Sequence, residues 1–416
     1  MTRSEIKTGI LGRVRNLAIN LLMAAAAVFV AYSGVVMLET AADAVCPRPP
    51  FPGKTGLLFP PHSRSSYEMK DYACEEVINS LGFRDREVSL KKDTGVFRVA
   101  VIGDSFTYGW GVNIGDCWVK VAERLLREQG LAVEILNLGK PAAGPPQYAQ
   151  IAETVLSKLQ PDMIVIALLA GDDLQQTGSD PTPSEWFAGR FPTLTLMRRY
   201  WRQMLLGAPW PDPSPVIMTA EQARKWYREV AVDILKTMDP EMRARYDGLE
   251  DTVKRLFLDG LLNPWMIQHA TGGPDYFLCT ADPKSPELLE KTALLSGELK
   301  QAAKTAKRRR VPVVALSIPE GFYVNDTAHK NVQRIGFEMA PEMLMSKTAD
   351  EAVHKAAKEA GLPSHDVSQG FRDRRADPGL YFEFDRHFTA AGNKLYGELV
   401  APVLADEINR AKSQKQ

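Results

Sequence analysis

A serine that could act as a nucleophile follows a short apolar segment. Residues Phe97 to Gly103 are largely apolar and β-branched and end at Asp104-Ser105. This pattern predicts a buried strand followed by a tight turn that presents the Ser105 hydroxyl. A serine attacks an acyl carbon only when a base removes its proton and donors hold the developing oxyanion. Gly, Asp and Ser are also common turn residues, so the motif alone fits a solvated turn equally well.

The candidate base is one of only six histidines in the chain. His387 lies directly before a predicted C-terminal helix and has a carboxylate, Asp385, two residues earlier. In an extended segment, residues i and i+2 project to the same side. Asp385 could therefore hold one ring nitrogen of His387 while the other nitrogen faces Ser105. Taken alone, an Asp-x-His sequence is more often an ordinary polar turn.

Alternating strands and helices must position these residues. Beyond residues 97–103, the apolar patterns predict strands at 133–138, 163–170 and 311–318, and helices at 118–130, 147–159, 348–360 and 390–412. Asp116 and Thr389 are the expected caps of the first and last of these helices. Residues 163–170 are almost continuously apolar, as in strands of a parallel sheet that helices cover on both faces. The sequence therefore predicts an α/β doubly wound fold.

This alternation breaks between about residues 177 and 298. Helical patterns occur at 194–206, 219–238 and 241–262, and Thr219 and Gln222 have capping-box spacing. The stretch contains five tryptophans: Trp186, Trp201, Trp210, Trp226 and Trp265. Such residues at helical spacing usually form a local core. The insertion nevertheless follows the carboxyl end of a strand, where open α/β sheets bind ligands, so it could also grip a substrate.

The N-terminus predicts a membrane anchor. Residues 17–38 contain no charged side chain and are long enough to cross a bilayer, and four basic residues precede them. Basic flanks stay in the cytoplasm, which places residues 1–16 inside and the remainder outside. Ala42-Asp43-Ala44 leaves a cleaved signal peptide as the alternative. Residues 39–96, rich in proline and polar residues, are expected to form a stalk and irregular lead-in to a folded domain at 97–410.

Composition argues against some classes of protein. Lys plus Arg and Asp plus Glu both number 51, so no net charge would attract nucleic acid. No His or Cys cluster has metal-ligand spacing, and we expect no metal or other cofactor. The four cysteines suit an oxidising compartment, and three complete pairings are possible. Cys46 with Cys74 is preferred because both lie in the segment that follows the anchor.

Four blocks in order resemble the SGNH (GDSL-type) hydrolase family, and more narrowly its membrane-anchored bacterial members. They are Gly103-Asp104-Ser105, Asn137 to Gly144, Gly171-Asp172-Asp173-Leu174 and Asp385-Arg386-His387. The runs Asn79 to Asp85 and Asp104 to Gly109 are also similar to that subgroup. The resemblance covers about residues 97–173 and 311–404. It implies a flavodoxin-like parallel sheet with the serine after the first strand and the aspartate and histidine before the last helix.

The resemblance also implies a role for each residue. Ser105 would be the nucleophile and would offer its backbone N–H to the oxyanion, with the N–H of Gly144 as a second donor. His387 would be the base and Asp385 its orienter. Asp172 stands where the family has an asparagine, whose amide donates to the oxyanion. A carboxylate can only accept, so Asp172 is either protonated beside Asp173, turned toward another partner, or a sign of an impaired site.

These observations predict a single-pass protein of a bacterial inner membrane with its catalytic domain in the periplasm or outside the cell. The expected activity is that of a serine esterase or deacylase acting on an acylated envelope glycan or a lipid ester. An O-acyltransferase would use the same residues. A non-catalytic module that binds acylated glycan is the third possibility, and Asp172 is the feature that favours it.

Overall fold

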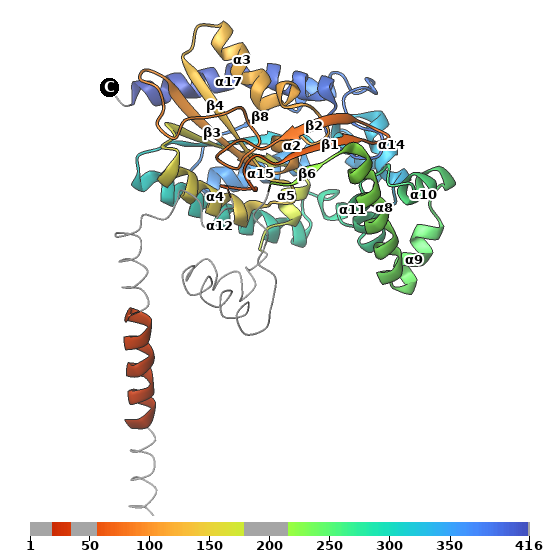
Figure 1. Ribbon diagram of the computed structural model, residues 1–416, viewed down its shortest axis with the longest axis horizontal. Coiled ribbons are helices and arrows are strands. Elements are labelled where there is room, and N and C mark those ends of the chain that lie inside the picture. Colours follow the sequence, from red (N-terminus) through yellow and green to blue (C-terminus); the bar gives the residue numbers. More distant parts are fainter. Residues whose placement is uncertain (1–18, 35–55, 179–214, 415–416) are drawn as a thin grey trace, which may run out of the picture. The chain divides into compact units, whose positions relative to one another are not determined.

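A computed structural model describes residues 19–34, 56–178 and 215–414 (Figure 1). The chain divides into two units, one made of residues 1–53 and 181–212, the other of 54–180 and 213–416. Of the first unit, the described part is a helix at 19–34 with several exposed large apolar side chains. Within the described ranges, no helix has the length and apolar character needed to span a membrane. The predicted span at 17–38 extends past this helix at both ends, and the predicted helix at 194–206 lies outside the described residues.

The second unit is built on a five-stranded parallel sheet. Its strands are β3 (Phe97–Gly103), β4 (Val133–Gly139), β5 (Met163–Leu169), β7 (Val313–Ile318) and β8 (Ser364–Asp366). Their spatial order is β4-β3-β5-β7-β8, with every neighbouring pair parallel. This is the strand order of flavodoxin-like sheets. The predicted α/β class with a doubly wound parallel sheet is confirmed, and β8 is a strand that the sequence patterns did not predict.

Helices cover both faces of this sheet (Figure 1). On one face, α3 (Trp118–Glu128) packs against α17 (Ala390–Ser413); on the other, α12 (Pro286–Arg308) packs against α4 (Pro145–Lys158) and α15 (Thr348–Glu359). Every residue of β3, β5 and β7 is consequently buried. Thr389 caps α17 as predicted, whereas α3 is capped at Cys117 because Asp116 belongs to a short 3-10 turn.

The lead-in before β3 is more regular than predicted. It contains an antiparallel hairpin of β1 (Arg64–Glu68) and β2 (Ala73–Val77), and β6 (Ile217–Met218) pairs with β1. Helix α8 (Ala220–Thr237) packs on β1. A small second core joins these parts to the main domain: Tyr67, Tyr72, Cys74, Val112, Ala223, Tyr227 and Phe382. The lead-in and the insertion therefore meet beside the turn that follows β3.

The described part of the insertion is helical, as predicted. Thr219 and Gln222 form the expected capping box of α8. The single helix expected at 241–262 is two helices, α9 (Pro240–Asp247) and α10 (Asp251–Leu258), and α11 (Pro264–Gly272) follows. Trp226, Tyr227 and Trp265 pack together, which supports a local aromatic core. The other α-helices of this unit are α2 (Ser105–Tyr108), α5 (Asp172–Gln175), α13 (Gly321–Val324), α14 (Asp326–Arg334) and α16 (Gln369–Arg372).

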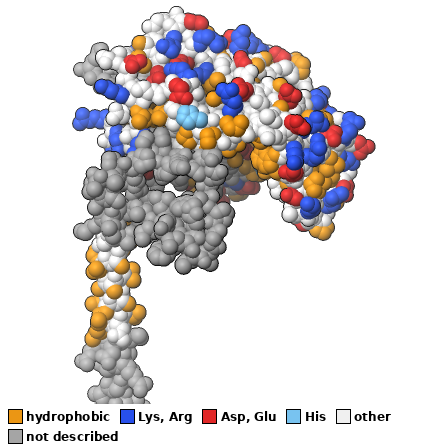
Figure 2. Space-filling model, in the orientation of Figure 1, with side chains coloured by type: hydrophobic (Ala, Val, Ile, Leu, Met, Phe, Trp, Pro, Cys, Tyr) orange, Lys and Arg blue, Asp and Glu red, His pale blue; other side chains and the backbone are white. Residues whose placement is uncertain are grey.

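The preferred pairing of Cys46 with Cys74 involves Cys46, which lies outside the described residues. Within the described ranges, Cys74, Cys117 and Cys279 are free thiols. Cys74 is buried in the second core, and this burial raises the pKa of its thiol to about 12. On the face of the unit that Figure 2 shows, basic and acidic side chains are interspersed.

Candidate active site

Ser105 is held at the carboxyl end of β3. The strand ends at Gly103, and Ser105 is the first residue of α2. Asp104 caps this helix, because its Oδ1 accepts a hydrogen bond of 2.9 Å from the N–H of Phe106. Gly109 ends the helix with a φ of 82°, a left-handed conformation that glycine adopts without strain. The turn predicted from the sequence is thus a short capped helix that fixes the serine.

The structure brings Ser105, His387 and Asp385 together. His387 Nε2 lies 2.7 Å from Ser105 Oγ, and its Nδ1 is hydrogen-bonded to Asp385 Oδ1. Both His387 and Asp385 are buried. An Nδ1–H that donates to Asp385 leaves the Nε2 lone pair free to accept the proton of the Ser105 hydroxyl. The three residues selected from the sequence therefore have the geometry of a hydrogen-bonded serine–histidine–aspartate relay.

Neighbouring aromatic rings fix the imidazole. The ring of Phe106 lies 4.8 Å and that of Trp110 5.9 Å from the His387 ring, measured between centroids. Trp110 Nε1 also donates to Asp385 Oδ2 over 3.4 Å. Trp110 belongs to the loop after α2 and was not selected from the sequence. The only available signal was its place five residues after the serine.

Asp71 is a second residue that sequence reasoning missed. It lies in the turn between β1 and β2, and its Oδ2 accepts the N–H groups of Phe384 at 2.6 Å and Asp385 at 3.1 Å. Burial, and then the charge of Asp385, raises the pKa of the Asp71 carboxyl to about 6, although the hydrogen bond from the N–H of Phe384 opposes this. Asp71 thus anchors the segment that carries Asp385 and His387.

Arg84 supports the other side of the site. This fully buried residue comes from the Asn79 to Asp85 run. Its guanidinium donates to the carbonyl oxygens of Tyr108, Gly109 and Val112 at 3.0, 2.6 and 2.5 Å. These bonds fix the loop after α2, from which Trp110 reaches Asp385. The run noted for its family resemblance therefore has a structural role next to the serine.

The structure does not leave the Gly144 N–H free for an oxyanion. Gly144 caps α4, and its N–H donates to Gln147 Oε1 at 3.0 Å. Ala142 lies in the preceding turn with a φ of 59° and lines the same cavity as Ser105. Among the described residues, neither the Ser105 N–H nor the Ala142 N–H has a hydrogen-bond acceptor. These two N–H groups fit an oxyanion hole better than Gly144 does.

Asp172 begins α5 and lines the cavity. Its Oδ2 accepts a hydrogen bond from Gln176 Nε2 at 2.7 Å, while its Oδ1 is buried and has no partner among the described residues. The next residue, Asp173, accepts bonds from Tyr148 Oη and the N–H of Leu169, each at 2.9 Å. Asp172 therefore contributes acceptor atoms to the cavity, whereas Asp173 has a structural role.

Crowded carboxyl groups surround the serine. Burial, and then the charges of Asp104 and Asp172, raises the pKa of Asp173 well above its ordinary value. Burial, and then the charge of Asp172, raises the pKa of Asp104 to about 7. Both shifts show that further negative charge here is unfavourable. An oxyanion at Ser105 therefore depends on the backbone donors.

The cavity beside Ser105 has a volume of about 390 Å³. Polar and aromatic side chains from the turn after β3, from α5 and α11, and from the His387 loop surround it. Its lining residues are Asp104, Ser105, Trp110, Pro141, Ala142, Leu169, Asp172, Gln176, Asn263, Trp265, Met266, Gln268, His269, Arg386 and His387. Insertion residues thus form one wall of it. The described ranges contain no cluster of three or more His, Cys, Asp or Glu side chains that could hold a metal ion.

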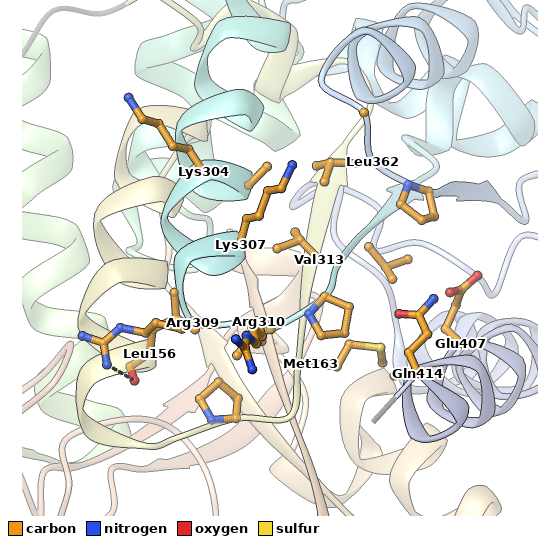
Figure 3. A pocket seen from close by; sticks show the side chains of 18 of the residues that line it. Leu156, Met163, Lys304, Lys307, Arg309, Arg310, Val313, Leu362, Glu407 and Gln414 are labelled. Atoms are coloured by element: carbon orange, nitrogen blue, oxygen red, sulfur yellow. Dashed lines mark hydrogen bonds between the residues drawn. The ribbon is translucent and has the colours of Figure 1, made fainter. Parts of the chain in front are cut away.

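A larger groove lies at the opposite edge of the sheet (Figure 3). Its volume is about 1650 Å³, and its lining includes Met163 and Val313, the first residues of β5 and β7. Lys304, Lys307 and Arg310 project around its apolar floor (Figure 3). No serine or histidine is among its described lining residues. The carboxyl edge, where doubly wound sheets bind their ligands, is therefore the candidate active site.

No protein-family model matches this chain, and no curated protein does. Several solved structures are similar to it at low identity. They include TesA, with 12% identity, a TM-score of 0.35 and coverage of 74% of this chain and 97% of that one. The esterase EstA from Pseudoalteromonas sp. has 9% identity, a TM-score of 0.36 and coverage of 75% and 98%. The acetyl xylan esterase AlAXEase has 11% identity, a TM-score of 0.35 and coverage of 74% of this chain and 99% of that one. With such TM-scores, these likenesses do not assign an activity to this chain.

Proposed function

We propose that this protein is a serine esterase or deacylase that cleaves an acyl ester through an acyl-enzyme. The observation that carries the proposal is the hydrogen-bonded relay from Asp385 through His387 to Ser105, with 2.7 Å between His387 Nε2 and Ser105 Oγ. It is supported by the free N–H groups of Ser105 and Ala142 at the cavity.

In this mechanism, Ser105 Oγ attacks the ester carbonyl carbon while its proton passes to His387 Nε2. The N–H groups of Ser105 and Ala142 stabilise the oxyanion. The tetrahedral intermediate then expels the alcohol, which takes the proton from His387, and an acyl-serine remains. Water repeats the sequence, with His387 as base, and releases the carboxylic acid. Asp385 keeps the imidazole oriented and stabilises its protonated form.

Asp172 favours one other function. A carboxylate near the oxyanion opposes the charge that develops in the transition state, and loss of an oxyanion donor costs about 10²–10³ in rate. A module that binds an acylated glycan without cleaving it needs no such donor. The serine–histidine relay still argues for hydrolysis, because a binding module has no use for a buried, oriented base.

We further propose that residues 17–38 anchor the protein in a bacterial inner membrane, with the catalytic unit in the periplasm or outside the cell. The exposed apolar side chains of the helix at 19–34 support this placement. The substrate would then be an acylated glycan or a lipid ester of the cell envelope. Protease accessibility of residues 54–416 in intact spheroplasts would test the orientation.

A fluorophosphonate probe tests the nucleophile. The full-length protein in detergent should react covalently at Ser105, and Ser105→Ala should remove the label. His387→Ala should slow labelling strongly. His354→Ala should not, because His354 belongs to α15 and is hydrogen-bonded to Ser364 of β8. A folded protein whose Ser105 stays unlabelled would overturn the assignment.

A further inference from the structure

Arg386 lies between the two relay residues Asp385 and His387 and has no role in the reaction described above. It lines the cavity beside Ser105 and is only 9% exposed. Its φ of 63° places it in the left-handed region, which costs energy for a residue with a side chain. The fold therefore holds this arginine in a strained conformation next to the nucleophile.

Aromatic rings support the guanidinium of Arg386. Its Cζ lies 5.0 Å from the ring centre of Phe277 and 5.4 Å from that of Phe337. Such contacts stabilise the charge but satisfy none of its N–H donors in the plane of the group. The guanidinium plane is thus fixed from the side, and these ring contacts use none of its N–H donors.

These donors lack acceptors. Nε and Nη1 of Arg386 are buried and have no hydrogen-bond partner among the described residues. Arg386 also forms no ion pair with any described residue. A buried charged group without a partner is costly, and such groups usually mark a missing ligand or ion. Among the described residues, the geometry therefore leaves two donors of this cation without an acceptor.

Acidic groups lie near Arg386 without bonding to it. Despite its burial, the charges of Glu320 and then Asp172 raise the pKa of Arg386. Neither forms a hydrogen bond or ion pair with it among the described residues, and both oxygens of Glu320 are buried without a partner there. Burial raises the pKa of the Glu320 carboxyl to about 8 despite the opposing charge of Arg386, so Glu320 is largely protonated at neutral pH. Asp385 is engaged by His387 and Trp110. Asp172 is bonded to Gln176 and keeps one free oxygen.

We propose that Arg386 binds a carboxylate of the substrate, so that the ester cleaved by Ser105 belongs to an acidic, hydroxyl-rich molecule such as an acylated sugar acid. This inference rests on the proposed hydrolase function and gives it a substrate class. A planar guanidinium pairs with a carboxylate through two parallel hydrogen bonds. The free oxygen of Asp172 is an acceptor for a neighbouring substrate hydroxyl.

The rest of the cavity suits a sugar ring. Asn263, Gln268 and His269 contribute polar side chains from the loop before α11 and from α11 itself. Trp265 also lines the cavity and is 39% exposed, so one ring face can stack on the C–H groups of a sugar. A simple fatty acyl ester would leave these polar groups and Arg386 without partners.

A binding experiment tests the proposal without using catalysis. Full-length Ser105→Ala protein is titrated with D-glucuronate and with its uncharged isostere D-glucuronamide, and binding is followed by isothermal titration calorimetry. We expect glucuronate to bind at least about tenfold more tightly, and Arg386→Gln to abolish this preference. Arg375→Gln is the matched control, since Arg375 is an exposed arginine paired with Asp326. Circular dichroism shows that each variant is folded.

A kinetic experiment locates the carboxylate. Two pairs of esters are compared, each with one anionic and one neutral member. In the first pair, 4-acetoxybenzoate carries its charge on the alcohol part, and its methyl ester is the neutral member. In the second pair, 4-nitrophenyl hemisuccinate carries its charge on the acyl group, and 4-nitrophenyl butyrate is the neutral member. Arg386→Gln should lower kcat/KM at least about tenfold more for the anionic member of one pair than for its neutral member. Arg386→Lys should recover part of the loss, because it keeps the charge without the planar fork.

Either an Arg386-dependent preference for glucuronate or one for an anionic ester supports the proposal, and the absence of both overturns it. If Arg386→Gln slows charged and neutral esters equally and glucuronate binding shows no dependence on Arg386, then Arg386 acts on the oxyanion instead, and the proposal fails. A protein that binds glucuronate through Arg386 yet cleaves no ester would refute the hydrolase function alone.

Discussion

Asp71 offers a demanding test of how the relay is positioned. Its carboxylate accepts the N–H groups of Phe384 and Asp385, although it lies more than three hundred residues earlier in the chain. In Asp71→Ala, both donors lose their acceptor. Each such loss costs about 1–3 kcal/mol. Since Asp71 is only partly buried, water can replace part of each bond, and we expect the free energy of unfolding to fall by about 2 kcal/mol in total.

The larger effect should be on catalysis. Without Asp71, the segment that carries Asp385 and His387 can shift, and a misplacement of about 1 Å costs about 10²-fold in rate. We therefore expect kcat for 4-nitrophenyl acetate to fall about 10–100-fold in Asp71→Ala, with KM changed less than about threefold. Asp71→Asn is the matched variant. Its amide oxygen can accept the same two bonds, and it should keep kcat within about threefold of the parent.

Stopped-flow or initial-rate assays of the full-length proteins, with thermal unfolding measured in parallel, decide the point. If Asp71→Ala is folded and hydrolyses the ester at the parental rate, the relay is positioned without Asp71. If Asp71→Asn is as slow as Asp71→Ala, the charge of Asp71 matters more than its hydrogen bonds, and the positioning argument is wrong.

Three further outcomes follow from the same geometry. Asp385→Asn should lower kcat by about 10³–10⁴-fold with little change in KM, measured with 4-nitrophenyl acetate, because the imidazole loses the partner that orients it; a loss below tenfold would contradict the relay. Asp172→Asn should raise kcat for small neutral esters by about tenfold or more, because an amide can donate to the oxyanion, and an unchanged rate would show that residue 172 does not face it. Glu320→Gln should become increasingly more stable than the parent as pH rises from about 5 to 8. Burial raises the pKa of Glu320 from 4.5 in the unfolded chain to about 8 in the folded protein. The parent therefore has its full free energy of unfolding below pH 4.5 and loses part of it as pH rises toward 8, whereas glutamine does not titrate. Thermal unfolding across this range, with no divergence between the two proteins, would refute that reasoning.

The sheet and its main helices could be predicted because their signals are local. A continuous apolar run such as that of β5 and an amphipathic repeat such as that of α3 each lie within one window of sequence. The two-residue β6 and the three-residue β8 are too short to give a periodic signal, and they depend on the strands beside them. The break between α9 and α10 was missed because the apolar pattern continues across it.

The sequence by itself determined which residues could do chemistry: Ser105 after an apolar strand, and His387 with Asp385 before the last helix. Their types and local spacing carry that information. Only the tertiary structure decided what surrounds them. Asp71 accepts two backbone N–H groups from a segment more than three hundred residues away. The N–H of Gly144 is occupied by Gln147, and the guanidinium of Arg386 has two donors without a partner among the described residues. No local pattern encodes them, because packing of the hairpin, the insertion and the sheet sets which donors find acceptors.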